Sequence, residues 1–404
     1  MASSAAAAPA VPPSLSLPPS QFARLQPHAY LLAHLSPPPA SNQPSIRANG
    51  RAPSQFRVTS ANSGSLTHTN GSAVVRVGDT AAVCGVRAEL LHTEDIASWS
   101  VSQASTANKR RRLGEKPTGK DEDATGNPDI EDDEDRTHIE DLSLLVPNLS
   151  LSTGCAPGFL PGAPPSALAQ SLSHQILSLL HSTRLVRADD LRVWYQPPNL
   201  GPEELERHNE GEQMDVDTEQ GATANESKPR EIKAFWVLYL DIMIISLAGN
   251  PFDAAWASVL AALRDTKLPK AWWDVDNETI LCSDNLAEAH KLSLRGMPVA
   301  SSFCAFEADA AAGWRAVVIP DAEDQKQRNS QQKWILADPD GYEEGLSSER
   351  ACVVVDKEKQ GKGKLAIVKM EKHGGWSIDT DDLRQLVNIS AQRWEEMKRI
   401  LDQC

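Results

Sequence analysis

The sequence lacks several patterns that mark common classes of protein. None of its six cysteines forms a CxxC pair or lies with histidines at the spacing of metal ligands. We therefore expect reduced core thiols in an intracellular protein rather than a disulfide framework, and we expect no metal or cofactor. No apolar run is long enough to span a bilayer, so no membrane association is expected. The N-terminus has no basic start and no compact apolar core, which is atypical of a signal peptide.

Motifs that cradle phosphate or activate a nucleophile are also missing. The glycine-rich stretches at residues 361–364 and 374–375 lack the spacing of a P-loop. The segment around Cys155 offers a thiol, but the sequence places no histidine to act as its base. The formal net charge of −15 argues against a general coat for nucleic acid. Much of that charge belongs to polar segments, so a local basic groove in the folded part is not excluded.

Several long segments have a composition that does not support a packed core. Residues 1–18 are rich in Ala, Pro and Ser, and we predict that they are disordered. Residues 95–140, 199–231 and 321–332 are polar, and we predict that they are insertions at the surface. The first insertion contains the basic cluster Lys109, Arg110, Arg111 and Arg112. Three interpretations of this cluster are open. It is a nuclear-import signal, it is an arm that contacts phosphate, or it is a solvated charge run balanced by the acids that follow it.

The remaining residues alternate between strand patterns and helix patterns. The most informative stretch begins with an apolar, β-forming run over residues 235–247 and continues through turn residues at 249–251. A helix pattern follows, and Asp253 is positioned to cap its start. The apolar face of that helix comprises Trp256, Val259, Leu260 and Leu263. We therefore expect a buried strand that leads through a tight turn into a packed helix.

Similar patterns predict the other elements. Strands are expected at residues 57–58, 65–69, 73–77, 80–88, 142–151, 185–194, 298–307, 334–338, 351–356 and 365–370. Helices are expected at residues 19–35, 166–180 and 381–401, and Pro27 is expected to limit the first of them. Asn-Gly at position 70 and Gly-Asp at position 78 are hairpin signals. The pattern indicates an α+β/α/β fold in which two β-meanders are backed by helices.

The start of the central helix lacks the chemistry of a phosphate site. A buried strand that leads through a glycine turn into a helix often binds phosphate, because the helix N-terminus presents free N–H groups. Here the helix begins with Pro251, Phe252 and Asp253. Proline has no N–H, phenylalanine carries no charge, and a carboxylate repels an anion. We therefore expect the strand, turn and helix of a phosphate site, but no binding of phosphate by them.

Several segments resemble the RNase PH family, in the same order along the chain. NGSAVVRVGDTAAVCGVRAEL, at residues 70–90, resembles the family's glycine-rich strand pair. SIRANGR, at residues 45–51, lies where the family has an RPDGR-type turn. Residues 235–263 resemble the central strand and helix of the family. MPVASSFCAFE at residues 297–307 and WILADPDGYEE at residues 334–344 resemble two later segments.

The resemblance implies an RNase PH-like fold, related to the second domain of ribosomal protein S5. It implies one such domain over residues 19–404, with a first half at about 45–270 and a second half at about 271–404. The late segment, with Asp-Pro followed by Glu-Glu, is typical of non-catalytic ring subunits of the eukaryotic RNA exosome. Such subunits form obligate heterodimers with other RNase PH-like subunits, and three heterodimers close a six-membered ring beneath cap subunits that bind RNA.

That resemblance also implies a role and a location. A ring subunit of this kind guides RNA and supports its 3′-to-5′ processing and degradation by an associated exoribonuclease, in rRNA maturation and mRNA turnover. The location implied is the nucleus and nucleolus, and also the cytoplasm. No catalytic activity is implied for the chain itself.

Comparison with active members of the family implies which positions have lost their chemistry. Active relatives carry a Gly-Thr-Arg phosphate grip at the start of the central helix, where this chain has Asp253. A carboxylate in place of that arginine reverses a charge-assisted contact, so phosphate binding is expected to be lost. Active relatives also place two aspartates after a late strand. Asp338 matches the first, but the second position falls near Glu343 and Glu344. Asp338 is either a turn residue beside Pro339 or a remaining acid of the site.

Contact with RNA is a separate question. The candidates in or near the first meander are Arg47, Arg51, Arg76 and Arg87. Family members line the ring channel with basic residues in such loops, although ordinary surface charges explain them as well. Trp272 and Trp273 are the nearest aromatic candidates for stacking on bases. Buried packing or a subunit interface suits these tryptophans better, because tryptophan is enriched at interfaces.

Two other classes of function remain open. The chain is an active phosphate-dependent 3′ exoribonuclease if other arginines replace the missing phosphate grip. Alternatively, it is a binding module that uses its acidic insertions as tails for partners.

Overall fold

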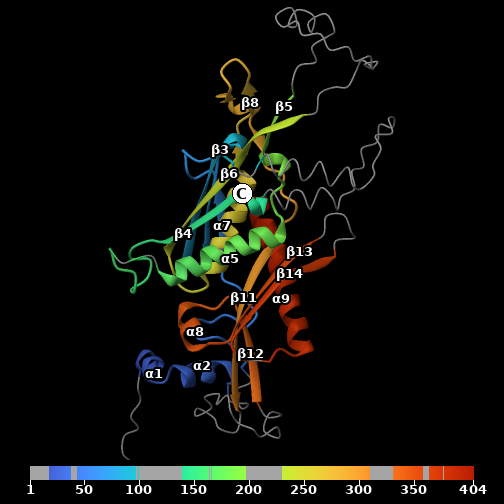
Figure 1. Ribbon diagram of the computed structural model, residues 1–404. Coiled ribbons are helices and arrows are strands. Elements are labelled where there is room, and N and C mark those ends of the chain that lie inside the picture. The colour runs from blue at the N-terminus through green and yellow to red at the C-terminus, as the bar shows by residue number, and fades with distance from the viewer. Residues whose placement is uncertain are drawn as a thin grey trace, which may run out of the picture. The chain divides into compact units, whose positions relative to one another are not determined.

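The computed structural model describes residues 18–37, 43–96, 99, 139–162, 164, 166–196, 230–309, 331–357, 364–375 and 377–404 (Figure 1). Nearly all of the predicted insertions, residues 1–17 and the cluster Lys109–Arg112 lie outside this part of the chain. The chain groups into two compact units that are not consecutive in sequence. The first unit comprises Met1–Arg57, Ser301–Cys352 and Met370–Ile389, and the second comprises the rest. The two units are described separately.

A six-stranded sheet forms the centre of the second unit. Its order is β1 (Thr59–Ser63), β2 (Gly71–Val77), β3 (Thr80–His92), β6 (Glu231–Ser246) and β4 (Leu145–Leu151), and β5 (Arg192–Tyr195) also pairs with β6. Neighbouring strands are antiparallel except β4, which runs parallel to β6. Gly78 and Asp79 connect β2 to β3, as the hairpin signal predicts. Residues 65–69 form a loop instead of the predicted strand, because their polar sequence has no neighbouring strand to pair with.

Two helices cover one face of this sheet. α7 (Pro251–Asp265) packs on β2, β3 and β6, and α5 (Ala167–Thr183) packs on β4. Leu145 and Leu149 of β4 are register neighbours of Leu238 and Ile242 of β6, and all four side chains are buried. These side chains point to one face because alternate residues of a strand share a face. Asp241, on the opposite face, is exposed, as is common in antiparallel sheets.

The glycine of the Asn-Gly-Ser segment is required by a close approach of the backbone. A Cβ atom on Gly71 would lie 2.4 Å from Thr266 Oγ1 and 2.6 Å from the Thr266 backbone. Thr266 is the residue that ends α7, and its neighbour Lys267 donates its backbone N–H to Asn70 O at 2.9 Å. The end of the central helix therefore lies directly against the start of β2, which leaves no room for a side chain.

The first unit contains the N-terminal helices and most of a second sheet. Its helices are α1 (Pro19–Leu25), α2 (Pro27–Leu35) and α8 (Gly341–Leu346). The sheet has the order β12 (Gln331–Ala337), β11 (Val299–Asp309), β13 (Arg350–Lys357) and β14 (Leu365–His373), and α9 (Thr380–Asp402) follows it in the chain. Pro27 occupies the first turn of α2 and separates it from α1, as the sequence predicts.

A small apolar core holds the N-terminal helices within the first unit. Leu31 and Leu35 of α2 form a buried cluster with Leu336 of β12. The partly buried side chains packed against that cluster are Phe306, Trp334 and Leu346. The N-terminal helices are therefore an integral part of the first unit.

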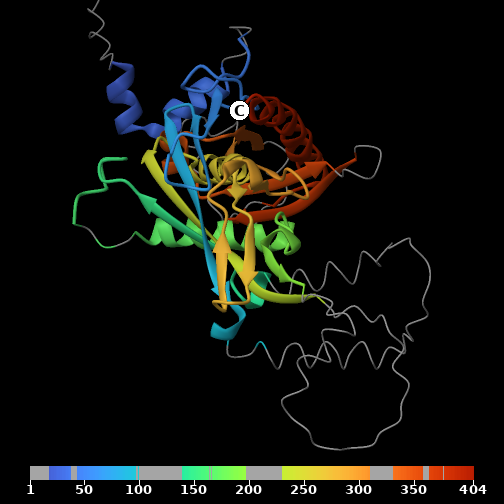
Figure 2. The ribbon, with the colours of Figure 1, turned by 90° about the horizontal axis from the view of Figure 1, so that it is seen from above.

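The sequence does not predict the short elements that follow α7. β7 (Lys267–Leu268) pairs with β10 (His290–Lys291), and β8 (Ala271–Asp274) pairs with β9 (Thr279–Cys282). Figures 1 and 2 show the β8–β9 hairpin at the end of the large sheet where β5 lies. Among the helices that the structure describes, none is sufficiently long and apolar to cross a bilayer.

Candidate functional site

A tight turn in the first unit positions Arg47 beneath the surface. Arg47 N donates to Arg51 O at 2.8 Å, Gly50 N donates to Arg47 O at 2.9 Å, and Gly50 has a φ of +82°. The arginine side chain is fully buried, and its Nε donates to Glu343 Oε1 at 2.8 Å. Arg47 Nη2 forms an ion pair with the second oxygen of Glu343. Arg47 is a candidate for RNA contact from the sequence, but its side chain has no exposed surface here. Its guanidinium neutralises the buried carboxylate of Glu343 instead.

Asp338 lies beside this ion pair and is held by Arg57, which no sequence pattern singles out as part of a site. Arg57 Nε donates to Asp338 Oδ2 at 2.8 Å, and Arg57 Nη2 donates to Oδ1 at 2.7 Å. The backbone N–H of Arg57 also donates to Oδ2, at 2.9 Å. Asp338 is fully buried, has a φ of +49°, and directly follows β12. This bidentate pairing is the strongest geometry for an Arg–carboxylate contact. The turn-residue interpretation of Asp338 agrees with its backbone conformation.

Arg51 completes the cluster from the surface side. Its Nη2 donates to the backbone O of Asp338 at 3.1 Å, and its Nη1 lies 3.5 Å from Asp338 Oδ2. Burial and the neighbouring Arg47 lower the pKa of the Arg51 guanidinium below its ordinary value. The Arg51 guanidinium lies near those of Arg47 and Arg57, and the carboxylates of Asp338 and Glu343 offset this repulsion. Arg51, a second candidate for RNA contact, is therefore largely engaged inside the protein.

Glu343 is fixed by its own helix as well as by Arg47. Asp340 caps α8, and the two residues form a capping box in which Asp340 N donates to Glu343 Oε2 at 3.0 Å. In return, Glu343 N donates to Asp340 Oδ1 at 2.9 Å. Glu344, the adjacent candidate, is half-buried in the same short helix. The carboxylate of Glu343 is thus saturated by donors from both sides.

The three arginines and two carboxylates described above form an internal clamp, in which buried ion pairs hold separate segments of the first unit together. A carboxylate that binds a metal or moves a proton must offer a lone pair toward the substrate. Here Asp338 and Glu343 instead accept hydrogen bonds from Arg47, Arg51 and Arg57. Within the described residues, no group of three or more His, Cys, Asp or Glu side chains is arranged to hold a metal ion.

At the start of α7, in the second unit, the first polar side chains hydrogen-bond to each other. The cap of this helix is Asn250, so the prediction that Asp253 caps it was wrong. Asn250 has a φ of +49°, its Nδ2 donates to Asp253 Oδ2 at 2.8 Å, and its Oδ1 accepts from Asp253 N at 3.4 Å. An asparagine that precedes a proline at the first helical position is a cap signal, and it could have identified Asn250. The carboxylate of Asp253 is buried in the first turn of the helix, where its negative charge disfavours the binding of an anion.

The other candidates for RNA contact lie on the surface of the second unit. Arg76 of β2 is 62 % exposed and lies 3.4 Å from Asp79. Arg87 of β3 is 56 % exposed, lies 3.3 Å from Glu89, and stacks over the ring of Tyr239. Each arginine is thus exposed and beside a carboxylate, so their contact with RNA stays a prediction. The basic cluster at residues 109–112 lies outside the described residues.

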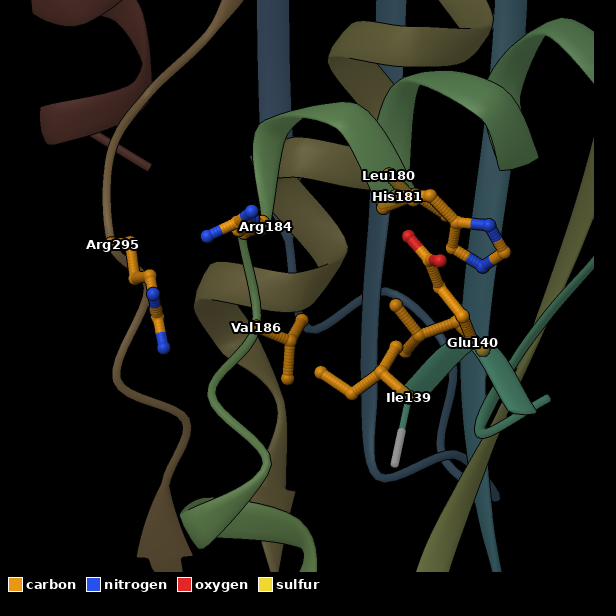
Figure 3. A pocket seen from close by; sticks show the side chains of 8 residues that line it. Ile139, Glu140, Leu180, His181, Arg184, Val186 and Arg295 are labelled. Carbon is orange, nitrogen blue, oxygen red and sulfur yellow. The ribbon is translucent and has the colours of Figure 1, made fainter. Parts of the chain in front are cut away.

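A small pocket in the second unit holds both acidic and basic groups (Figure 3). Figure 3 shows the carboxylate of Glu140 directed toward the ring of His181, while Arg184 and Arg295 lie on the other side. The pocket leaves about 20 Å³ for the centre of a water molecule, which is room for roughly one water. This enclosed space alone is too small for a nucleotide. Glu140, His181 and Arg184 also line a more open hollow of about 440 Å³ beside it.

Comparisons with known proteins indicate the class of protein to which this fold is similar. A model of the 3′ exoribonuclease family, RNase PH domain 1, matches residues 123–269. The archaeal exosome of Archaeoglobus fulgidus, solved with RNA bound to its active site, contains a chain with the same fold. That match has a TM-score of 0.51 and 18 % sequence identity, and it covers 93 % of this chain and 98 % of the other. The chain has an RNase PH-like fold, as the sequence predicts, and residues 123–269 are similar to the RNase PH family.

Two curated proteins are similar to this chain in sequence over most of their length. The chain is 28 % identical to the exosome complex component rrp43 of Schizosaccharomyces pombe over 380 residues, which are 94 % of this chain and 97 % of the relative. It is 21 % identical to the exosome complex component Rrp42 of Methanothermobacter thermautotrophicus over 358 residues, which cover 88 % of this chain and 89 % of that relative. The sequence resemblance to rrp43 therefore extends over nearly the whole of both chains.

Proposed function

We propose that this chain is a structural ring subunit of an RNA exosome and does not itself cleave RNA. The observation that carries this proposal is the burial of Asp338 and Glu343 against Arg47 and Arg57. A phosphorolytic site needs exposed acids near the leaving 3′ oxygen and cations that hold phosphate. In this chain the acids are neutralised internally, and the start of α7 presents Asp253 in place of a cation.

The names of the relatives support the proposal of exosome partners. Both relatives are named exosome complex components, and both match this chain over most of their length. We expect an obligate heterodimer with another RNase PH-like subunit, which closes with two further heterodimers into a six-membered ring. Cap subunits, an associated exoribonuclease and RNA complete the assembly. The chain would support rRNA maturation and mRNA turnover in the nucleus, nucleolus and cytoplasm.

The first test is the composition and native mass of the assembly that purifies with the tagged chain from its own cells. A stoichiometric complex that contains other RNase PH-like chains is the expected result. A lone chain or a homo-oligomer would contradict the proposal.

An active phosphate-dependent 3′ exoribonuclease is the alternative, and the description of the matching family favours it. The assay supplies single-stranded RNA, inorganic phosphate and Mg²⁺ to the purified chain and measures released nucleoside diphosphates. We expect none above the background of a mock purification. Release that disappears in an Asp338→Asn variant of unchanged thermal stability would instead establish the enzyme.

A further inference from the structure

The β8–β9 hairpin of the second unit presents an apolar pair on its outer face. Trp272 of β8 and Leu281 of β9 are directly opposite in register, so their side chains lie on the same face. Trp272 is 40 % exposed and Leu281 is 41 % exposed. Val275, in the turn between the two strands, is 57 % exposed. An exposed cluster of this kind is typical of an interaction site, whereas single exposed apolar residues are not.

The opposite face of the hairpin is anchored to the rest of the unit. Lys233 of β6 lies 5.2 Å from the ring centre of Trp273 and 5.7 Å from that of Tyr195 on β5. A cation between two rings holds β8 beside β5. Because the Trp273 face packs against β6 and β5, the face that carries Trp272 and Leu281 is the one exposed to solvent.

The hairpin is also strongly acidic. Between Ala271 and Leu286 the chain carries Asp274, Asp276, Glu278 and Asp284 but no Lys or Arg. Asp276, Glu278 and Asp284 are exposed, and they lie around the apolar pair in the turn and just after β9. The neighbouring Lys270, just before β8, is paired with Glu288. An apolar pair with exposed carboxylates at both ends of the hairpin is complementary to an apolar surface that carries positive charge.

We propose that this face binds another protein through a segment in which apolar side chains are flanked by lysine or arginine. Trp272 would be its central anchor, because tryptophan in the middle of an interface contributes more than most residues. The stability of the hairpin supports the same inference. A two-stranded ribbon with exposed apolar side chains is marginally stable in water and gains stability when a partner covers it.

Charge distinguishes this partner from other occupants. RNA is disfavoured because its phosphates would be repelled by the carboxylates of the hairpin. Residues 197–229 of this chain contain nine acidic and two basic residues, so they are disfavoured for the same reason. The chain's own basic cluster at residues 109–112 is followed by an acidic run through Asp135, which opposes its binding to an acidic surface. The inference does not depend on the assignment to an exosome.

The test replaces Leu281 with the photoreactive residue benzoylphenylalanine, in the full chain within its purified native assembly. The matched control carries the same residue at Leu160, which is 69 % exposed on a loop of the second unit. We expect position 281 to crosslink to a peptide of a different protein that contains apolar and basic residues, with several-fold higher yield than position 160. A crosslink to RNA, to this chain, or at a yield equal to that of the control would overturn the proposal.

A charge reversal tests the role of the carboxylates. We expect Asp276→Lys with Asp284→Lys to lower the crosslink yield at position 281 about fivefold or more, through like-charge repulsion. The matched pair Asp79→Lys with Asp241→Lys changes the net charge equally at exposed sites and should leave the yield unchanged, because Asp241 lies eight residues along β6 from the anchoring Lys233. Thermal unfolding of both variants establishes that the fold is retained. An equal effect of the two pairs would show that only overall charge matters, and it would overturn the proposed surface.

Discussion

Arg47 and Glu343 are 296 positions apart in the sequence, yet they form a fully buried ion pair within the first unit. The pair joins the turn that follows the N-terminal helices to helix α8. Two buried charges are costly unless their hydrogen bonds are complete, and here backbone carbonyls accept from the remaining guanidinium hydrogens. The acids that resemble a catalytic site therefore fasten the N-terminal segment to the unit.

The first prediction concerns this pair. Arg47→Met should destabilise the first unit by about 3–5 kcal/mol, because it leaves Glu343 as an uncompensated buried charge. Hydrogen exchange of α8 and β12 in the purified assembly measures the loss of stability. The control is Arg76→Met, which removes an exposed ion pair and should cost roughly 0–1 kcal/mol. Equal protection in wild type and Arg47→Met would contradict the clamp.

The local elements of the fold could be predicted from the sequence because their causes are local. Gly78-Asp79 specifies a hairpin, Pro27 starts α2, and Ser166 caps α5 through a hydrogen bond to Ala169 N at 3.1 Å. The periodic apolar residues of α9 likewise predict its helix. The β8–β9 hairpin was not predicted, because its apolar residues do not alternate with polar ones.

The partners within the candidate site could not be predicted in the same way. The pairing of Arg57 with Asp338 joins positions 281 residues apart, and no local pattern specifies it. An isolated arginine in a turn fits either an ordinary surface charge or a contact with RNA, and the sequence leaves both interpretations open for Arg47 and Arg51. Only the fold shows that these arginines and the two late acids meet in one buried cluster.

The second prediction concerns the start of α7. Asn250→Ala removes the cap and places an ordinary residue in a left-handed conformation, so the second unit should lose about 2 kcal/mol. Asn250→Gly also removes the cap but tolerates the positive φ, so it should cost only about 0.5 kcal/mol. Thermal unfolding of the two variants separates the contributions. An equal loss in both would mean that the backbone conformation contributes nothing.

The third prediction concerns the thiols. Burial raises the pKa of Cys304 to about 12, and it also raises the pKa of Cys84. Both thiols therefore remain protonated at pH 8, whereas the exposed Cys404 is accessible to reagent. A short pulse of iodoacetamide followed by mass spectrometry should label Cys404 at least tenfold faster than Cys84 and Cys304. Denaturant should abolish the difference, and rapid labelling of Cys304 in the native protein would contradict its burial.

The fourth prediction tests whether the N-terminal helices are part of the fold. Leu31 of α2 is 1 % exposed and packs in the cluster with Leu336, so Leu31→Ala should destabilise the first unit by about 2–5 kcal/mol. Leu25 at the end of α1 is 66 % exposed, and Leu25→Ala should change stability by less than about 0.5 kcal/mol. Hydrogen exchange of α2 and β12, the two elements that form the cluster, measures both. If Leu31→Ala were as mild as Leu25→Ala, the helices would add nothing to the stability of this unit, and the Arg47 clamp would have to hold the N-terminal segment alone.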